Sequence, residues 1–182
     1  EFDDSIRNYK GFYIARYEAG KERSNGKSIL VSKPNVLPWT QIVWEEARKQ
    51  SLKMYKENDL FQTDLVNSYA WDTICNWIRD CGYNIDNSTE YGNYQNSANG
   101  TKKVMETASN DRWKTNNIYD MAGNVWELST ETAEECGEHD KKHIGRGGDY
   151  LNDGDKYPIS TRATSSDESN LDVGFRVVLY LK

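Results

Sequence analysis

The chain has 182 residues, 12% of them aromatic, and a formal net charge of -6. This length fits a single domain spanning residues 1–182, and the aromatic content argues against disorder, because disordered chains are poor in aromatic residues. The acidic balance and the lack of a Lys/Arg block argue against a nucleic-acid partner, since phosphate binding needs clustered positive charge. No apolar run approaches the roughly 20 residues of a membrane-spanning helix, so no membrane insertion is expected.

The first half of the chain predicts one strand and two helices. Residues 11–18 are aromatic and β-branched, which is typical of a strand, and residues 20–35 are polar enough for a loop or an irregular hairpin. Thr40 is a plausible N-cap for a first helix. A second helix is expected to begin at Ser68, which would be its N-cap, and to end at Gly82, which suits a left-handed C-terminal cap.

The second half is dominated by polar loops. Residues 83–117 are rich in Asn, Ser, Gly and Thr, and so long an irregular stretch usually means a functional or cation-fixed loop. Residues 144–150 predict a short strand with a glycine corner, residues 151–172 are again polar, and residues 174–180 give the strongest strand signal. Two helices, strands at both ends and long irregular loops predict an α+β domain.

The three cysteines are Cys75, Cys81 and Cys136, and an odd number leaves at least one thiol without a partner in the chain. Cys75 and Cys81 lie six positions apart around a predicted helix end, an awkward geometry for a disulfide. Buried or inert thiols are therefore favoured, and the cysteines leave the cellular compartment open. The opening dipeptide Glu-Phe could be a cloning scar, and the chain a fragment of a longer protein.

Five short motifs follow one another along the chain. They are Phe-Tyr-Ile-Ala-Arg-Tyr-Glu at 12–18, Trp-Glu-Glu-Ala at 44–47, Ala-Gly-Asn-Val-Trp-Glu at 122–127, Arg-Gly-Gly at 146–148 and Gly-Phe-Arg-Val at 174–177. Together they resemble the formylglycine-generating enzyme (sulfatase-modifying factor) family, which has a C-type-lectin-like fold. The resemblance implies that the first and last strands pair.

The resemblance also implies an active site, from which this sequence departs. Catalytic members of the family carry two cysteines after the Arg-Gly-Gly strand, which bind copper as thiolates. The matching positions here fall at about Asn152 and Tyr157, and no cysteine follows Cys136, so no copper is expected. His139 and His143 could in principle supply an iron site with a carboxylate, but both precede the Arg-Gly-Gly strand. Two solvated loop histidines are therefore favoured.

A calcium site is the part of the family's machinery expected to survive. Family members hold a cation on the loop that matches residues 120–127. Asp120 and Glu127 would donate carboxylates, and Gly123 and Val125 would donate backbone carbonyls, which suits an ion that takes six to eight oxygen ligands. The ion would be structural. The alternative is that Asp120 only starts a turn and that Glu127 is solvated.

Two further side-chain placements follow from the expected strands. Glu18 and Arg176 lie on strands expected to be neighbours, where they would form a partly buried ion pair or be two exposed strand ends. Trp126 is expected in the core, because its ring would be costly to expose and no second aromatic residue forms an evident sugar platform beside it.

The segment from residue 149 to 170 predicts a binding surface. Tyr, Asn, Ser and Asp combine contact area with versatile hydrogen bonding, and the segment matches the place of the family's substrate groove. An ordinary polar loop is the alternative. The candidate ligand-binding residues are Tyr150, Asn152, Asp153, Asp155, Lys156, Tyr157, Ser165, Ser166 and Asn170.

Two functions in different classes remain open. The first is a non-catalytic, receptor- or adhesion-type module that recognises a protein or glycan ligand on a cell or phage surface. The late segment resembles the ligand-binding face of the variable proteins served by diversity-generating retroelements, which would imply a bacterial or phage surface. The second is an oxidase or other enzyme of the family with altered chemistry. The sugar-binding motifs Glu-Pro-Asn and Trp-Asn-Asp are absent, so calcium-mediated sugar binding is not expected.

Overall fold

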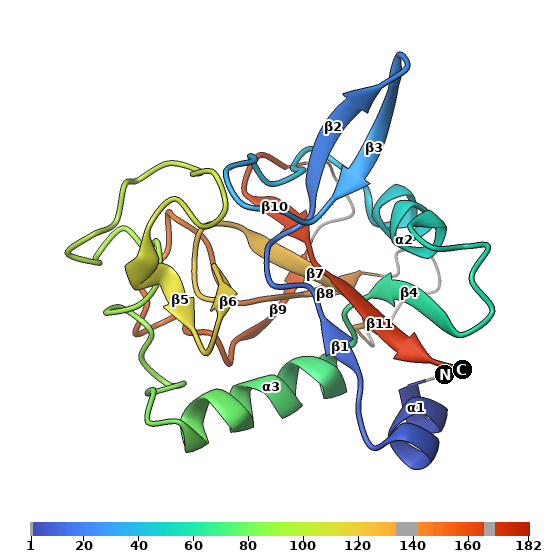
Figure 1. The fold of residues 1–182 in the computed structure, drawn as a ribbon. Helices are drawn as coiled ribbons and strands as arrows, with labels where there is room; N and C mark the ends of the chain where they lie inside the picture. The colour runs from blue at the N-terminus through green and yellow to red at the C-terminus, as the bar shows by residue number, and fades with distance from the viewer. Residues whose placement is uncertain (1, 134–141, 166–169) are drawn as a thin grey trace.

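The computed structural model describes residues 2–133, 142–165 and 170–182, and within these ranges the chain folds as a mixed α+β domain (Figure 1). The α+β prediction is confirmed, with one more helix than expected at the N-terminus. The helical elements are α1 (Phe2–Tyr9), α2 (Trp44–Lys53), α3 (Ser68–Asp80) and the short 3-10 helix η1 (Asp111–Trp113). None of the described helices is long and apolar enough to cross a membrane.

One sheet joins the two ends of the domain. It has the order β1 (Tyr13–Ile14), β11 (Val177–Leu181) and β4 (Phe61–Leu65), and both pairings are antiparallel. The predicted pairing of the first and last strands is thus confirmed, although β1 is only two residues long. The C-terminal strand also contacts α1, because Ser5 Oγ accepts a hydrogen bond of 3.1 Å from the backbone N–H of Leu181.

A second sheet carries most of the motifs that define the resemblance. Its order is β10 (Val173–Phe175), β7 (Trp126–Thr132), β8 (His143–Arg146) and β9 (Arg162–Ser165); β10 runs parallel to β7, whereas the other pairings are antiparallel. In this sheet Glu127 on β7 lies between Gly174 on one neighbour and Arg146 on the other. Motifs from three distant parts of the chain therefore meet on adjacent strands.

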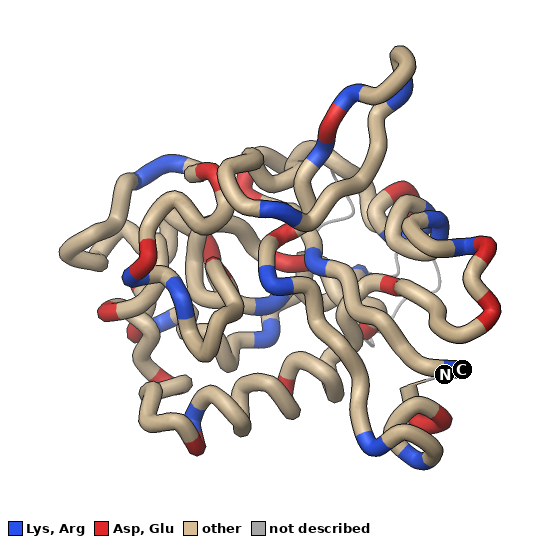
Figure 2. Tube along the Cα trace, in the orientation of Figure 1, with Lys and Arg blue, Asp and Glu red and all other residues tan. Residues whose placement is uncertain are grey.

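Two hairpins project from this frame (Figure 1). β2 (Gly20–Ser24) and β3 (Lys27–Val31) form a ribbon that extends away from the body, which is the hairpin alternative predicted for this region. β5 (Lys114–Thr115) and β6 (Ile118–Tyr119) form a smaller ribbon beside the long loops. Lys and Arg, and Asp and Glu, are scattered over the described trace (Figure 2).

The two predicted helices exist, with small shifts at their starts. α2 begins at Trp44 and not directly after Thr40, because Gln41 has a left-handed φ of 54° that no helical turn can contain. α3 begins at Ser68 as expected, but the cap is Asn67, whose side chain accepts a hydrogen bond from the backbone N–H of Ala70. Gly82 has the predicted left-handed conformation, with a φ of 96°.

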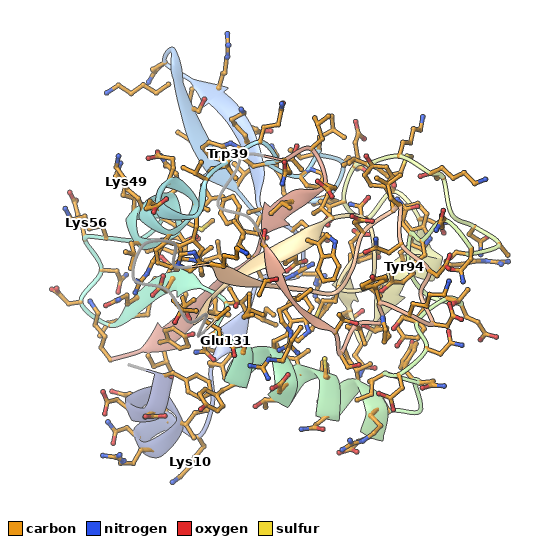
Figure 3. The ribbon with its side chains drawn as sticks, turned by 180° about the vertical axis from the view of Figure 1, so that it is seen from behind. Lys10, Trp39, Lys49, Lys56, Tyr94 and Glu131 are labelled. Carbon is orange, nitrogen blue, oxygen red and sulfur yellow. The ribbon has the colours of Figure 1, made fainter. Side chains whose placement is uncertain are left out.

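The long loops pack around a buried tyrosine. Tyr94 is fully buried, and its hydroxyl donates a hydrogen bond of 2.7 Å to the carbonyl of Gly147. Asn93 donates to the Lys103 carbonyl and to the side chain of Asn124, so its amide links the loop to β7. Figure 3 places Tyr94 inside this loop-rich half. The loop prediction for residues 83–117 is therefore confirmed apart from η1 and β5.

Candidate functional site

The turn that leads into β7 needs unusual backbone conformations. Asp120, Gly123 and Asn124 all have left-handed φ values, of 59°, 72° and 63°. At Gly123 a Cβ atom would lie 2.6 Å from the carbonyl oxygen of Asn93, so only glycine fits. This turn places the carboxylates of Asp120 and Glu127 inside the protein, where each residue is 1% exposed.

Glu127 forms a buried ion pair with Arg176. The guanidinium Nε lies 3.0 and 2.9 Å from the two carboxylate oxygens, and NH2 lies 2.5 Å from Oε1. The guanidinium also donates to the carbonyls of Ala15 (3.0 Å) and Tyr119 (2.8 Å). The Arg176 side chain thereby joins the segments that contain Ala15 and Tyr119 to Glu127 on β7.

Glu18 is not the direct partner of Arg176, so that part of the prediction is wrong. Glu18 is fully buried and accepts hydrogen bonds of 3.1 and 2.8 Å from Asn124 Nδ2. Arg176 is close enough to lower the pKa of Glu18, but burial and the charges of Asp120 and Glu127 outweigh it and hold that pKa well above its usual value. Sequence could not decide which of two buried carboxylates would receive the guanidinium.

The predicted calcium donors can be compared with these contacts. Asp120 Oδ2 accepts hydrogen bonds of 2.8 Å from the Thr107 hydroxyl and from the Ala108 N–H. Asp120 Oδ1 is buried and has no hydrogen-bond partner among the described residues, and burial raises the pKa of this carboxyl to about 6. A buried oxygen without a partner suits a cation, whereas Glu127 would have to share its oxygens between Arg176 and the ion.

The lack of a partner for Asp120 Oδ1 among the described residues is therefore the observation that suits a cation, while donation by the carbonyls of Gly123 and Val125 stays a prediction. No group of three or more His, Cys, Asp or Glu side chains in the described part of the chain is arranged to hold a metal. The predicted site does not require such a group, because it relies on two carboxylates and two backbone carbonyls.

A pocket of about 430 Å³ lies beside the second sheet and is called the binding pocket below. Strands β8 and β9 contribute Gly145, Ala163, Thr164 and Ser165. The segment after β8 contributes Asp149, Leu151, Asn152 and Tyr157. The remaining lining residues are Trp126 at the start of β7 and Asn170, Asp172 and Val173 near β10.

Four of the predicted ligand-binding residues line this pocket: Asn152, Tyr157, Ser165 and Asn170. Their positions bring the two places that the family resemblance assigns to cysteines, Asn152 and Tyr157, into one cavity. Neither side chain can supply a thiolate, so the residues present do not fit copper.

The other predicted binding residues lie elsewhere. Asp153 and Lys156 form an exposed ion pair of 2.6 Å with each other, and Asp155 accepts a hydrogen bond from Asn96 beside a separate hollow. Tyr150 is half-buried near Asp149 and Asp172, whose charges help to raise its pKa. The last residue of the predicted set, Ser166, lies outside the described residues.

Trp126 packs against the second core cluster, as predicted, but it is only partly buried and also lines the binding pocket. Its ring is half-buried and meets the Tyr157 ring edge-on, with 5.8 Å between centroids and an interplanar angle of 82°. Because side chains alternate along a strand, Trp126 and the buried Glu127 must point to opposite faces of β7. That alternation was a signal in the sequence that could have located Trp126.

Two carboxyl groups that were not predicted also meet in the pocket. Asp149 is 2% exposed, its Oδ1 accepts a hydrogen bond of 2.7 Å from the Leu151 N–H, and its carboxyl hydrogen-bonds to that of Asp172. Burial, with a contribution from Asp172, raises the pKa of Asp149 to about 6. A carboxyl with this pKa is mostly deprotonated at neutral pH, so Asp149 can carry a negative charge in the pocket.

The described cysteines and histidine lie outside this pocket. Cys75 is a buried free thiol on α3, and burial raises its pKa to about 12, whereas Cys81 is an exposed free thiol at the C-terminal end of that helix. His143 is buried on β8 and stacks on Trp44 with 3.8 Å between ring centroids, so the prediction of a solvated loop histidine is wrong for it. Cys136 and His139 lie outside the described residues.

Comparison with known families agrees with this architecture. The family described as "Sulfatase-modifying factor enzyme 1-like domain" matches residues 2–181. The chain belongs to this family. A search of curated proteins finds no match.

Solved structures show the same fold at low sequence identity. The structure titled "Crystal Structure of CarF" matches with a TM-score of 0.63 at 16% identity. The match covers 100% of this chain and 82% of the CarF chain. PvdO from Pseudomonas aeruginosa has a TM-score of 0.59 at 14% identity, covering 98% and 76% of the two chains. Treponema denticola variable protein 1 has a TM-score of 0.50 at 17% identity, covering 87% of this chain and 60% of that one.

Proposed function

We propose that this member of the family is a non-catalytic ligand-binding module that holds a protein or glycan ligand in the binding pocket. The observation that carries the proposal is the position of Asn152 and Tyr157. They line a cavity at the place where the family resemblance expects copper-binding thiolates. The cavity is kept, and its lining offers aromatic surface and hydrogen-bonding groups in place of thiolates.

The likeness to a variable protein supports the same direction. Treponema denticola variable protein 1 shares the fold, and the late segment here resembles the binding face of variable proteins. We therefore place the proposed ligand on a bacterial or phage surface and give calcium a structural role at Asp120. In this proposal the calcium stabilises the turn behind the pocket and takes no part in chemistry.

The experiment is to probe peptide and glycan arrays with the purified protein and two matched variants. Tyr157 and Tyr55 are exposed to similar extents, 41% and 47%, but only Tyr157 lines the binding pocket. Tyr157→Ala should abolish array binding, whereas Tyr55→Ala should leave it unchanged. Binding that survives Tyr157→Ala, or the absence of any specific binding, would refute the proposal.

An enzyme with altered chemistry is the second candidate, because of the Asp149–Asp172 pair. A carboxyl group with a pKa near 6 inside a pocket has the properties of a general acid or base. Incubation in air with a cysteine-containing sulfatase-type peptide, with and without copper, tests for oxidase activity. Turnover that Asp149→Asn or Tyr157→Ala removes would replace the binding proposal with an enzymatic one.

A further inference from the structure

Among the described residues that line the binding pocket, the charged side chains are two aspartates. Asp149 and Asp172 both line it, and none of its described lining residues is Lys, Arg or His. The nearest loop cation, Lys156, is held by Asp153 on the exposed side of the loop, and Arg162 of β9 is paired with Glu131. The two pocket carboxylates therefore lack a cationic partner within the described lining.

The carboxyl pair is sheltered, which makes an unbalanced charge more costly than on an open surface. Asp149 is 2% exposed, and Asp172 is half-buried. One oxygen of Asp149 already accepts the Leu151 N–H, and the Asn152 side chain accepts the Asp149 N–H at 3.1 Å. These contacts hold the Asp149 backbone and one carboxylate oxygen but supply no positive charge, so a cationic ligand would gain from contact with the pair.

Aromatic rings form another wall of the same pocket. The Trp126 and Tyr157 rings meet edge-on at 5.8 Å between centroids, and both residues line the pocket. Aromatic faces attract cations within about 6 Å of the ring centroid, and they also cover the alkyl stem of a long amine. The pocket thus combines a carboxyl pair with an aromatic surface, a combination that suits an alkylammonium group.

We propose that the binding pocket recognises a primary ammonium group on an alkyl stem, as in a lysine side chain or a free alkylamine. The ammonium nitrogen would donate hydrogen bonds to the carboxylates of Asp149 and Asp172, and the stem would lie against Trp126 and Tyr157. This inference rests on the proposed function, because it names the chemical class that the pocket holds.

The test is an NMR titration of the labelled protein at pH 7.5 with three small probes. Nα-acetyl-lysine N-methylamide presents the ammonium in a peptide, n-pentylamine presents it alone, and Nα-acetyl-norleucine N-methylamide has a side chain of similar length without the charge. At least one amine should bind at least about tenfold more tightly than the norleucine probe, because hydrogen bonds to charged groups are the stronger kind. Preference between the two amines distinguishes a peptide lysine from a free amine.

Asp172→Asn and Asp155→Asn make the matched pair of variants. Both remove one carboxylate, but Asp155 is exposed and lies outside the binding pocket. Asp172→Asn should remove the preference for the amines, whereas Asp155→Asn should retain it. A titration of resonances far from the pocket serves as the check that each variant is folded.

Failure of this inference differs from failure of the proposed function. Equal binding of the amine and norleucine probes, or no amine binding at all, would overturn ammonium recognition. Array binding that depends on Tyr157 would still support the binding module in either case. Amine preference that persists in Asp172→Asn but is lost in Asp155→Asn would also overturn it, because the charge would then act from outside the pocket.

Discussion

Replacement of Arg176 by methionine tests the structural centre of the domain most directly. Arg176 is fully buried and donates to both oxygens of Glu127 and to the carbonyls of Ala15 and Tyr119. Methionine keeps much of the volume but removes the charge and every one of these donors. The variant is left with a buried carboxylate and two backbone acceptors that have lost their partners.

The size of the effect follows from that loss. Removing one partner of a buried ion pair costs about 3–5 kcal/mol, because an uncompensated charge stays behind. For a domain of this size each kcal/mol lowers Tm by about 2–4 °C, so Tm should fall by roughly 6–20 °C. The exposed pair Arg162–Glu131 provides the control, since Arg162→Met should cost less than about 1 kcal/mol.

Urea unfolding followed by tryptophan fluorescence measures the free energy of unfolding, with EDTA present so that bound cations make no contribution. The double variant Arg176→Met/Glu127→Met should recover much of the loss, because replacing both members of a buried pair by apolar groups is often neutral. The reasoning fails if Arg176→Met loses no more than Arg162→Met. It also fails if the double variant loses the sum of the two single changes, since the residues would then act independently.

Three further outcomes are expected. If calcium binds through Asp120, EDTA should lower the Tm of the wild type in differential scanning calorimetry and leave the Tm of Asp120→Asn unchanged. Equal Tm values of the wild type with and without EDTA would exclude a stabilising ion. Amine affinity should rise as pH increases from 5 to 7.5, because Asp149, whose pKa is raised to about 6, then loses its proton; a flat titration profile would contradict this. Gly82→Ala should cost about 1–2 kcal/mol for its left-handed φ alone. Gly148→Ala should cost more, since its Cβ would also lie 2.5 Å from the Tyr157 carbonyl oxygen; equal unfolding free energies would count against that contact.

The sequence predicted the parts of the fold that depend on local pattern. The aromatic first strand, the apolar last strand and the capped helix α3 all carry signals within a few residues of themselves. Strand β4 was missed because its sequence, Phe-Gln-Thr-Asp-Leu, alternates weakly and buries Thr63 and Asp64. Those polar residues are tolerated by contacts with α2: Thr63 donates to the Ser51 carbonyl, and Asp64 accepts from Arg48. Such partners become visible only when distant segments meet.

The same limit applies to the candidate site. Asn152 and Tyr157 could be predicted because the motif order fixed where the late segment should lie. Asp149 and Asp172 could not be paired from the sequence, since 22 intervening positions separate them and their meeting depends on β10 running parallel to β7. Likewise, the preference of Arg176 for Glu127 over Glu18 depends on side-chain geometry that strand order alone does not supply.

One strand links the scaffold to the pocket. On β7, Glu127 points inward to Arg176 and the core, whereas its neighbour Trp126 points to the binding pocket. The motif shared with the family therefore has two faces, one that forms the buried ion pair and one that lines the pocket. Residues on the pocket face, including Asn152 and Tyr157, can change without breaking the buried ion pair. In the proposed function, this separation lets the chain keep the family fold while its pocket presents carboxyl groups and aromatic rings to a ligand.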